Sequence, residues 1–169
     1  MKFKKPEFWD LKKQNIVSYL LYPFTIFLEL NNFILSLISK KKIKDIKSIC
    51  IGNIYVGGTG KTPATIKLYN IFKKMNFKVC TGKKYYSDHS DEQILLKNKT
   101  NLICQNNRIQ IVNEALKKKN EIIIFDDGLQ DRTLDYDFKI VCFDSDNWIG
   151  NGQLIPSGPL REKLTSKKI

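Results

Sequence analysis

The stretch Gly57-Gly58-Thr59-Gly60-Lys61-Thr62-Pro63 decides the fold of this 169-residue chain. Its glycines let backbone amides turn toward a phosphate, Lys61 offers a positive charge, and the Thr62 hydroxyl can bind Mg²⁺. A β-rich run, Ser48–Ile54, precedes it and a helical pattern, Pro63–Met75, follows, which is the context of a phosphate-binding P-loop. The pattern G-x-x-x-x-G-K-[ST] begins with glycine, whereas this chain has Tyr55 followed by Val56. We therefore predict an atypical P-loop over 55–62, and the alternative is a glycine-rich turn with an exposed lysine.

Short β-rich runs alternate with helical patterns from residue 46 onward. The further expected helices are 91–97 and 109–118, and the further expected strands are 78–81, 101–104, 122–125 and 138–143. Parallel strands need crossover connections, so this alternation predicts an α/β fold in which helices flank a parallel sheet.

Two acidic residues follow the apolar strand expected at 122–125. Asp126 and Asp127 come directly after it and precede a glycine. A carboxylate at the end of a strand beside a P-loop binds the metal that accompanies the phosphates. We predict Asp126 as a metal ligand beside Thr62, with Asp127 in a supporting role, and the alternative is a simple Asp-Gly turn.

The first 47 residues are unusually basic. They hold ten lysines and four acidic residues, so their net charge of +6 is half of the +12 of the whole chain. Lysines bracket an apolar stretch, Ile16 to Ile38, whose large side chains repeat at helical spacing. Pro23 should start a second helical segment or kink a single helix.

This apolar stretch has two interpretations. Glu29, Asn31 and Asn32 lie near its middle, where a membrane span would place them in the bilayer core at high cost. A helical segment lying at an anionic membrane surface avoids that cost. Packing of its apolar face against its own domain is equally compatible with the pattern. A nucleic-acid partner is disfavoured because the basic excess surrounds an apolar helix and no nucleic-acid motif is present.

The four cysteines indicate neither zinc nor a disulfide framework. Cys50, Cys80, Cys104 and Cys142 form no C-x-x-C pair, and His89 is the single histidine. We expect reduced thiols and a cytosolic environment.

Several motifs together resemble the tetraacyldisaccharide 4′-kinase family of lipid A assembly. They occur in the family's order: Pro6-x-Phe8-Trp9, Leu21-Tyr22-Pro23, Asn53, Gly57–Pro63, Asp91-Glu92, Asp126–Gln130, Gly150–Gly152 and Pro156–Glu162. The resemblance implies a kinase at the cytoplasmic face of the bacterial inner membrane that transfers the γ-phosphate of Mg·ATP to the 4′-hydroxyl of a lipid disaccharide 1-phosphate.

The resemblance also assigns roles to residues. It implies that Gly57, Gly58, Thr59, Gly60, Lys61 and Thr62 hold the triphosphate, with Asp126 and Asp127 on the metal side. Asp91 would activate the sugar hydroxyl beside Glu92, and Arg161 and Glu162 would lie at the rim of the site. From the residues alone, Ser90-Asp91-Glu92-Gln93 is also a helix-capping box.

The chain departs from the family in two places. The family has an Arg-Gly-Tyr segment and a longer stretch before the Asp-Glu pair, where this chain has 82–90. The sequence covers the family's amino-terminal half. We therefore expect a helical membrane-facing segment at 1–45 and a nucleotide-binding domain at 46–169. The activity is that of a kinase or, alternatively, of an incomplete ATP-binding module or one part of a split kinase whose other half is separately encoded.

Overall fold

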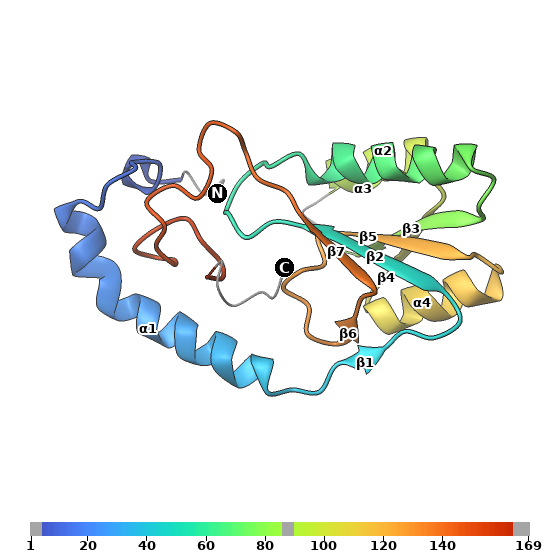
Figure 1. The fold of residues 1–169 in the computed structure, drawn as a ribbon, viewed down its shortest axis with the longest axis horizontal. Coiled ribbons are helices and arrows are strands. Elements are labelled where there is room, and N and C mark those ends of the chain that lie inside the picture. The colour runs from blue at the N-terminus through green and yellow to red at the C-terminus, as the bar shows by residue number, and fades with distance from the viewer. Residues whose placement is uncertain (1–4, 86–89, 164–169) are drawn as a thin grey trace. The chain divides into compact units, whose positions relative to one another are not determined.

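The structure is a computed structural model that describes residues 5–85 and 90–163 (Figure 1). The chain divides into two compact units. The first comprises Met1–Ile38, Asn53–Thr59 and Phe143–Ile169, and the second comprises Ser39–Gly52 and Gly60–Cys142. The predicted division at residue 45 separates functions rather than compact units, and it stays a prediction.

The second unit is built on a five-stranded parallel sheet with the order β4-β3-β5-β2-β7. Its strands are β2 (Lys47–Gly52), β3 (Val79–Lys84), β4 (Leu102–Gln105), β5 (Ile122–Asp126) and β7 (Phe138–Val141). Between them run α2 (Lys61–Lys74), α3 (Ser90–Lys99) and α4 (Arg108–Lys117). The predicted α/β fold is confirmed.

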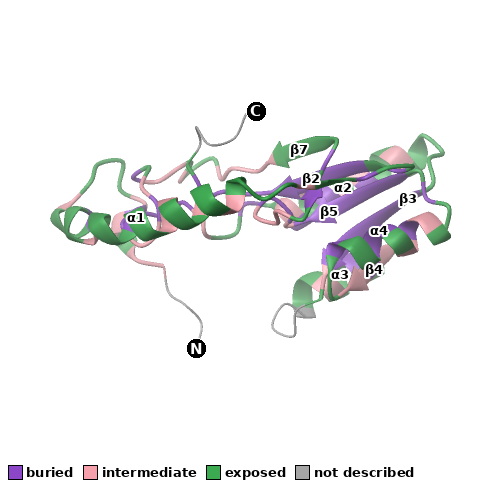
Figure 2. Ribbon diagram, turned by 90° about the horizontal axis from the view of Figure 1, so that it is seen from below, coloured by how far each residue is buried: buried purple, intermediate pink, exposed green. Residues whose placement is uncertain are grey.

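Both faces of this sheet are covered. On one face Ile122 and Ile124 pack with Tyr69 of α2, and on the other Ile123 and Phe125 pack with Ile111 of α4. Helix α3 contacts α2. The central strand β5 is buried along its whole length, as its unbroken apolar sequence predicts (Figure 2).

Several boundaries differ from the prediction: the strands expected at 48–54 and 138–143 end at Gly52 and Val141, and two other differences involve glycine and proline. Strand β3 continues through Gly82 to Lys84. A Cβ at position 82 would come within 2.9 Å of the Ile111 side chain, so this strand position needs glycine for close packing against α4. Helix α2 begins at Lys61, before Pro63, which the first turn of a helix tolerates since its N–H groups have no helical partner. A pair of two-residue strands, β1 (Lys41–Lys42) and β6 (Leu134–Asp135), was not predicted.

The first unit contains the 3₁₀ helix η1 (Glu7–Trp9) and one long helix, α1 (Ile16–Ser36). The alternative of a second helix that starts at Pro23 is wrong, because α1 runs through this proline without interruption. The Asn15 side chain caps α1 by accepting a hydrogen bond from the Ser18 amide at 2.9 Å. One missing N–H donor is not enough to end a helix of 21 residues.

Helix α1 packs on the first unit through polar side chains. Ser18 and Thr25 are buried, and Asn32, seven residues further on, donates to the carbonyl oxygen of Arg161 at 3.1 Å. We call these three residues the polar seam. Most of α1 is coloured as exposed in Figure 2. Its exposed large apolar side chains include Ile16, Val17, Leu20, Phe24, Phe27, Leu30, Phe33 and Ile34, whereas Leu21, Leu28 and Leu35 are half-buried. Within the described residues, no helix has both the length and the apolarity that crossing a bilayer requires.

Candidate active site

The glycine-rich loop begins where β2 ends and is shaped from within by Asn53. This side chain is fully buried, and its Nδ2 donates to the carbonyl oxygens of Tyr55 at 2.5 Å and Gly57 at 3.2 Å. Gly57 has φ +146° and Gly60 has φ +73°, conformations that residues with a Cβ rarely adopt. The Thr59 hydroxyl is buried without a hydrogen-bond partner. A ligand rich in oxygen atoms would satisfy it.

The structure explains why tyrosine can stand at the first glycine position of the P-loop pattern. Tyr55 is buried, and its backbone pairs with Leu160. The phenol interacts with Asp10 and with Lys5, whose Nζ lies 2.7 Å from its oxygen, and burial and the Asp10 bond raise the Tyr55 pKa. The Val56 amide donates to Pro159 at 2.8 Å. The start of the loop is thus anchored within the first unit by backbone hydrogen bonds and by the Tyr55 phenol.

The first turn of α2 carries Lys61 and Thr62, and both contact the acidic pair at the end of β5. The Thr62 hydroxyl donates to Asp126 Oδ2 at 3.2 Å, and Lys61 Nζ lies 3.6 Å from Asp127 Oδ1. Because β2 and β5 are parallel neighbours, the element that follows each of them begins at the same edge of the sheet. The structure brings together these four predicted residues.

A buried arginine that the sequence analysis missed holds the turn after β5. Arg108, the first residue of α4, is 5% exposed; it donates to the Asp127 carbonyl oxygen at 2.6 Å and forms an ion pair with Asp131. Burial opposes its charge, but Tyr136 and Asp131 outweigh burial and raise the Arg108 pKa. Asp127 has φ +56°, so this contact stabilises a conformation that is uncommon for aspartate.

A second missed residue, Lys83, lies among the predicted acids. Its side chain is 4% exposed, and its Nζ lies 2.6 Å from Asp126 Oδ2 and 2.6 Å from Glu92 Oε2. Burial disfavours the ammonium, but the two carboxylates outweigh burial and raise the Lys83 pKa. Only the extension of β3 beyond Gly82 brings Lys83 here, and the sequence pattern ended that strand too early.

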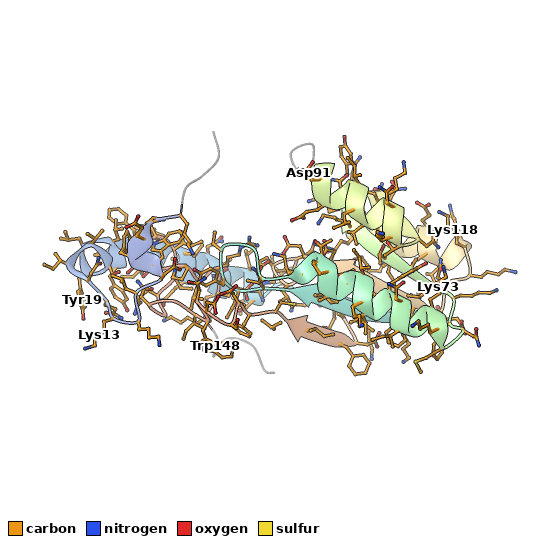
Figure 3. All side chains as sticks on the ribbon, turned by 90° about the horizontal axis from the view of Figure 1, so that it is seen from above. Lys13, Tyr19, Lys73, Asp91, Lys118 and Trp148 are labelled. Carbon is orange, nitrogen blue, oxygen red and sulfur yellow. The ribbon has the colours of Figure 1, made fainter. Side chains whose placement is uncertain are left out.

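The predicted base Asp91 is exposed in the first turn of α3, at one end of the helix in Figure 3. Its neighbour Glu92 forms an ion pair with Lys83, which in turn contacts Asp126. The capping-box alternative also places both acids in the first turn, and its Ser90 side chain lies outside the described part of the structure. The roles of Asp91 and Glu92 stay predictions.

Arg161 and Glu162 belong to the first unit, together with the start of the loop. The Arg161 amide donates to the Ile54 carbonyl oxygen at 2.7 Å, and Glu162 is buried. Residues 159–161 and 54–56 therefore form one local structure. The predicted place of Arg161 and Glu162 at the rim of the site stays a prediction.

The oxygen atoms at the start of α2 and the end of β5 suit a magnesium ion. In the described ranges 5–85 and 90–163, no group of three or more His, Cys, Asp and Glu side chains is arranged to hold a metal. A nucleotide-bound Mg²⁺ takes only one or two protein oxygens and completes its shell with phosphates and water. The Thr62 hydroxyl and the Asp126 carboxylate, 3.2 Å apart, fit that requirement. The four cysteines are free, as expected.

Comparison with known proteins confirms the resemblance. The family model LpxK, described as tetraacyldisaccharide-1-P 4′-kinase, matches residues 17–82 and 79–168. Over 170 residues the chain is 51% identical to the tetraacyldisaccharide 4′-kinase of Pelagibacter ubique, which covers 99% of this chain and 53% of that protein. It is 35% identical to the Rickettsia bellii enzyme of the same name over 96% of this chain and 55% of that protein.

A solved structure has the same fold. It is LpxK from Aquifex aeolicus in complex with ATP, with a TM-score of 0.72 and 25% identity over 89% of this chain and 56% of that chain. The chain spans about half the length of the curated relatives that it matches.

Proposed function

Because the chain belongs to the tetraacyldisaccharide-1-P 4′-kinase family, we propose that it binds Mg·ATP and takes part in transfer of the γ-phosphate to the 4′-hydroxyl of a lipid A disaccharide 1-phosphate. The observation that carries this proposal is the contact between the two P-loop residues Lys61 and Thr62 and the carboxylates that follow β5. The ATP complex of the similar Aquifex aeolicus protein supports the choice of nucleotide.

The loop supplies the groups that bind a triphosphate. Amides of Gly57–Thr62 and the buried Thr59 hydroxyl bind phosphate oxygens, and Lys61 neutralises the terminal phosphates. Thr62 and Asp126 hold Mg²⁺, which when bound offsets the negative charge of the β- and γ-phosphates. Asp127 orients Lys61 through their ion pair.

The acceptor side of the reaction needs one proton acceptor. Asp91 accepts the proton of the 4′-hydroxyl while the oxygen of that hydroxyl bonds to the γ-phosphorus. The bond between the γ-phosphorus and the bridging oxygen breaks, and ADP leaves. Arg161 and Glu162 lie at the rim of the site. They follow, in the sequence, the Pro-rich segment that anchors the start of the glycine-rich loop. The exposed position of Asp91 leaves it accessible to a substrate that enters from solvent.

The exposed apolar side of α1 supports association with an anionic membrane surface. The helix is fixed to its own unit by the polar seam: the Ser18 hydroxyl donates to Ser157 O at 3.0 Å and accepts from Asn151 at 2.9 Å. Its apolar side chains are consequently left for another partner, and Lys12, Lys13, Lys40, Lys41, Lys42 and Lys44 bracket them in the sequence. This arrangement suits a helix lying in the headgroup region at the cytoplasmic face of the bacterial inner membrane, where the lipid substrate is reached.

Nucleotide binding is tested with the purified chain and a fluorescent ATP analogue in the presence of Mg²⁺. Lys61→Ala should weaken binding at least tenfold, because it removes the charge that faces the phosphates. Lys67→Ala, at an exposed position of the same helix, is the matched control and should bind as the unchanged chain does. Equal binding by all three proteins would refute the P-loop assignment.

Transfer is tested with radiolabelled ATP and the lipid acceptor. Labelled product from the chain alone supports a self-sufficient kinase. The half-length match favours a second candidate function, that of an ATP-binding module that needs another part. In that case product appears only after addition of a polypeptide corresponding to the second half of a relative. ATP binding without product in either mixture leaves the catalytically incomplete module.

Membrane binding is tested by flotation with anionic and neutral vesicles, beside a duplex DNA-binding assay. Flotation with anionic vesicles and no DNA binding supports the proposal, and the reverse would favour a nucleic-acid partner.

A further inference from the structure

Lys83 makes contacts that no part of the proposed reaction requires. It is a lysine on an interior strand of the sheet, and its ammonium lies 2.6 Å from both Asp126 and Glu92. Burying an ammonium is costly unless carboxylates surround it, so its two short contacts compensate for a large desolvation cost. A methionine or leucine would fill this position at lower cost, which indicates that the charge itself has a task.

The attachment of α3 to the sheet indicates the role of the Lys83 charge. Of its large apolar side chains, Leu96 is fully buried while Ile94 and Leu95 are 56% and 41% exposed. Cys104 of β4 donates to the Gln93 side chain of α3 at 3.7 Å. Two further polar contacts come from alternate residues of β3, which point to the same face of the sheet. Lys83 holds Glu92 in the first turn, and the Thr81 hydroxyl contacts the Thr100 hydroxyl at 2.6 Å, just after the last turn.

We propose that Lys83 is a positioning residue, which fixes the first turn of α3, and with it Asp91, relative to the carboxylate of Asp126. One ammonium contacts the metal-side acid directly and the residue next to the predicted base directly. Asp91 follows the position of the turn because it precedes Glu92 in the chain. The catalytic part of this inference rests on the proposed function, whereas the attachment of α3 does not.

The test compares variants by amide hydrogen exchange in the absence of nucleotide. Lys83→Met and Glu92→Ala should each raise the exchange rate of the Ile94–Lys97 amides at least tenfold, because the first turn is released. The double variant should exchange no faster than Lys83→Met alone, since a lost contact cannot be lost twice. Lys97→Met removes an exposed lysine of the same helix, and it should leave these amides unchanged.

Two further exchange measurements serve as controls. The amides of α4 should keep their exchange rates in Glu92→Ala, which separates a local release from general unfolding. Lys83→Arg, which keeps the charge, should restore at least part of the protection lost in Lys83→Met. Unchanged exchange of α3 in both Lys83→Met and Glu92→Ala would overturn the proposal, as would additive effects in the double variant.

Activity then separates this inference from the proposed function. In any mixture that gives labelled product, Lys83→Met should lower kcat at least tenfold and leave the KM for ATP unchanged, since Lys61 and Thr62 stay in place. A rise in KM with unchanged kcat would contradict positioning of Asp91. Failure of every mixture to give product refutes the proposed function and leaves the exchange result to decide the attachment of α3.

Discussion

Strand β5 of the second unit and helix α1 of the first unit bury opposite kinds of side chain. In the second unit the buried residues of β5 are Ile122, Ile123, Ile124 and Phe125, followed by a single acid. In the first unit the buried residues of α1 are Ser18 and Thr25, while its phenylalanines are exposed and Leu21, Leu28 and Leu35 are half-buried. Burial in β5 follows hydrophobicity, whereas the two most buried side chains of α1 are hydrogen-bonded hydroxyls. An apolar face that its own domain does not cover marks a surface for another partner.

The largest effect is expected where the comparison is clearest, in the sheet. Phe125 is fully buried, with its ring 5.2 Å from that of Tyr136, and Phe125→Ala leaves a cavity. We expect a loss of about 3–5 kcal/mol in the free energy of unfolding. Urea denaturation measures it, with Phe138→Ala as the matched control, since Phe138 is 64% exposed on the same sheet. Equal losses in the two variants would contradict the assignment of Phe125 to the core.

A buried ion pair gives the next largest effect and one that depends on pH. Asp131→Asn removes the partner of the buried Arg108 and should cost about 2–3 kcal/mol near pH 7. Burial raises the pKa of Asp131, but its bonds with Thr133 and Arg108 outweigh burial and hold that pKa below the ordinary value of 3.8. This stabilisation is therefore complete above the unfolded-state pKa and is lost as the pH falls through the lower folded-state pKa.

The measurement is urea denaturation of both proteins from pH 7 downward. The difference between them should stay constant to about pH 4 and shrink below it. A difference that grows on acidification would show that the Asp131 carboxylate destabilises the fold.

The sequence predicted the sheet well because its pattern is local. Uninterrupted apolar runs such as Ile122–Phe125 identify buried parallel strands, and the glycines before Lys61 identify the loop between strand and helix. Four of the predicted site residues, Lys61, Thr62, Asp126 and Asp127, come together as expected.

What the sequence could not predict depends on contacts between distant residues. Lys83 contacts Asp126, 43 residues away, and Arg108 contacts Asp131, 23 residues away. A lysine on a strand or an arginine at a helix start carries no local sign of such a partner. The periodicity of α1 did separate its polar from its apolar residues. It could not show which side faces the protein, because that depends on whether Asn151 and Ser157 offer hydrogen bonds.

In the polar seam, a more apolar side chain is expected to destabilise the protein, which is the opposite of its usual effect at a buried position. Ser18→Val makes the buried face of α1 more apolar, yet we expect it to destabilise the protein by about 1–2 kcal/mol, because Asn151 and Ser157 lose a buried partner. Ser36→Val, the same change at an exposed position of the same helix, is the control and should cost about 0.5 kcal/mol or less. Thermal unfolding compares them, and stabilisation by Ser18→Val would show that the helix prefers an apolar packing face.

The smallest effect on stability is expected on the outer side of the same helix. Phe27 is 74% exposed, so Phe27→Ala should change the free energy of unfolding by about 0.5 kcal/mol or less, in contrast to Phe125→Ala. If this side chain enters the headgroup region, the same variant should bind anionic vesicles about tenfold more weakly, as expected for the loss of a largely buried aromatic ring.

Phe138→Ala separates membrane binding from general apolarity. Phe138 is exposed to a similar degree, but it lies on the edge strand β7 and not on α1. Its variant should float with vesicles as the unchanged chain does. Equal weakening by both variants would mean that vesicles bind exposed rings without regard to position. Unfolding caused by Phe27→Ala would mean that the apolar side of α1 stabilises the protein itself, so the contrast between β5 and α1 would no longer hold.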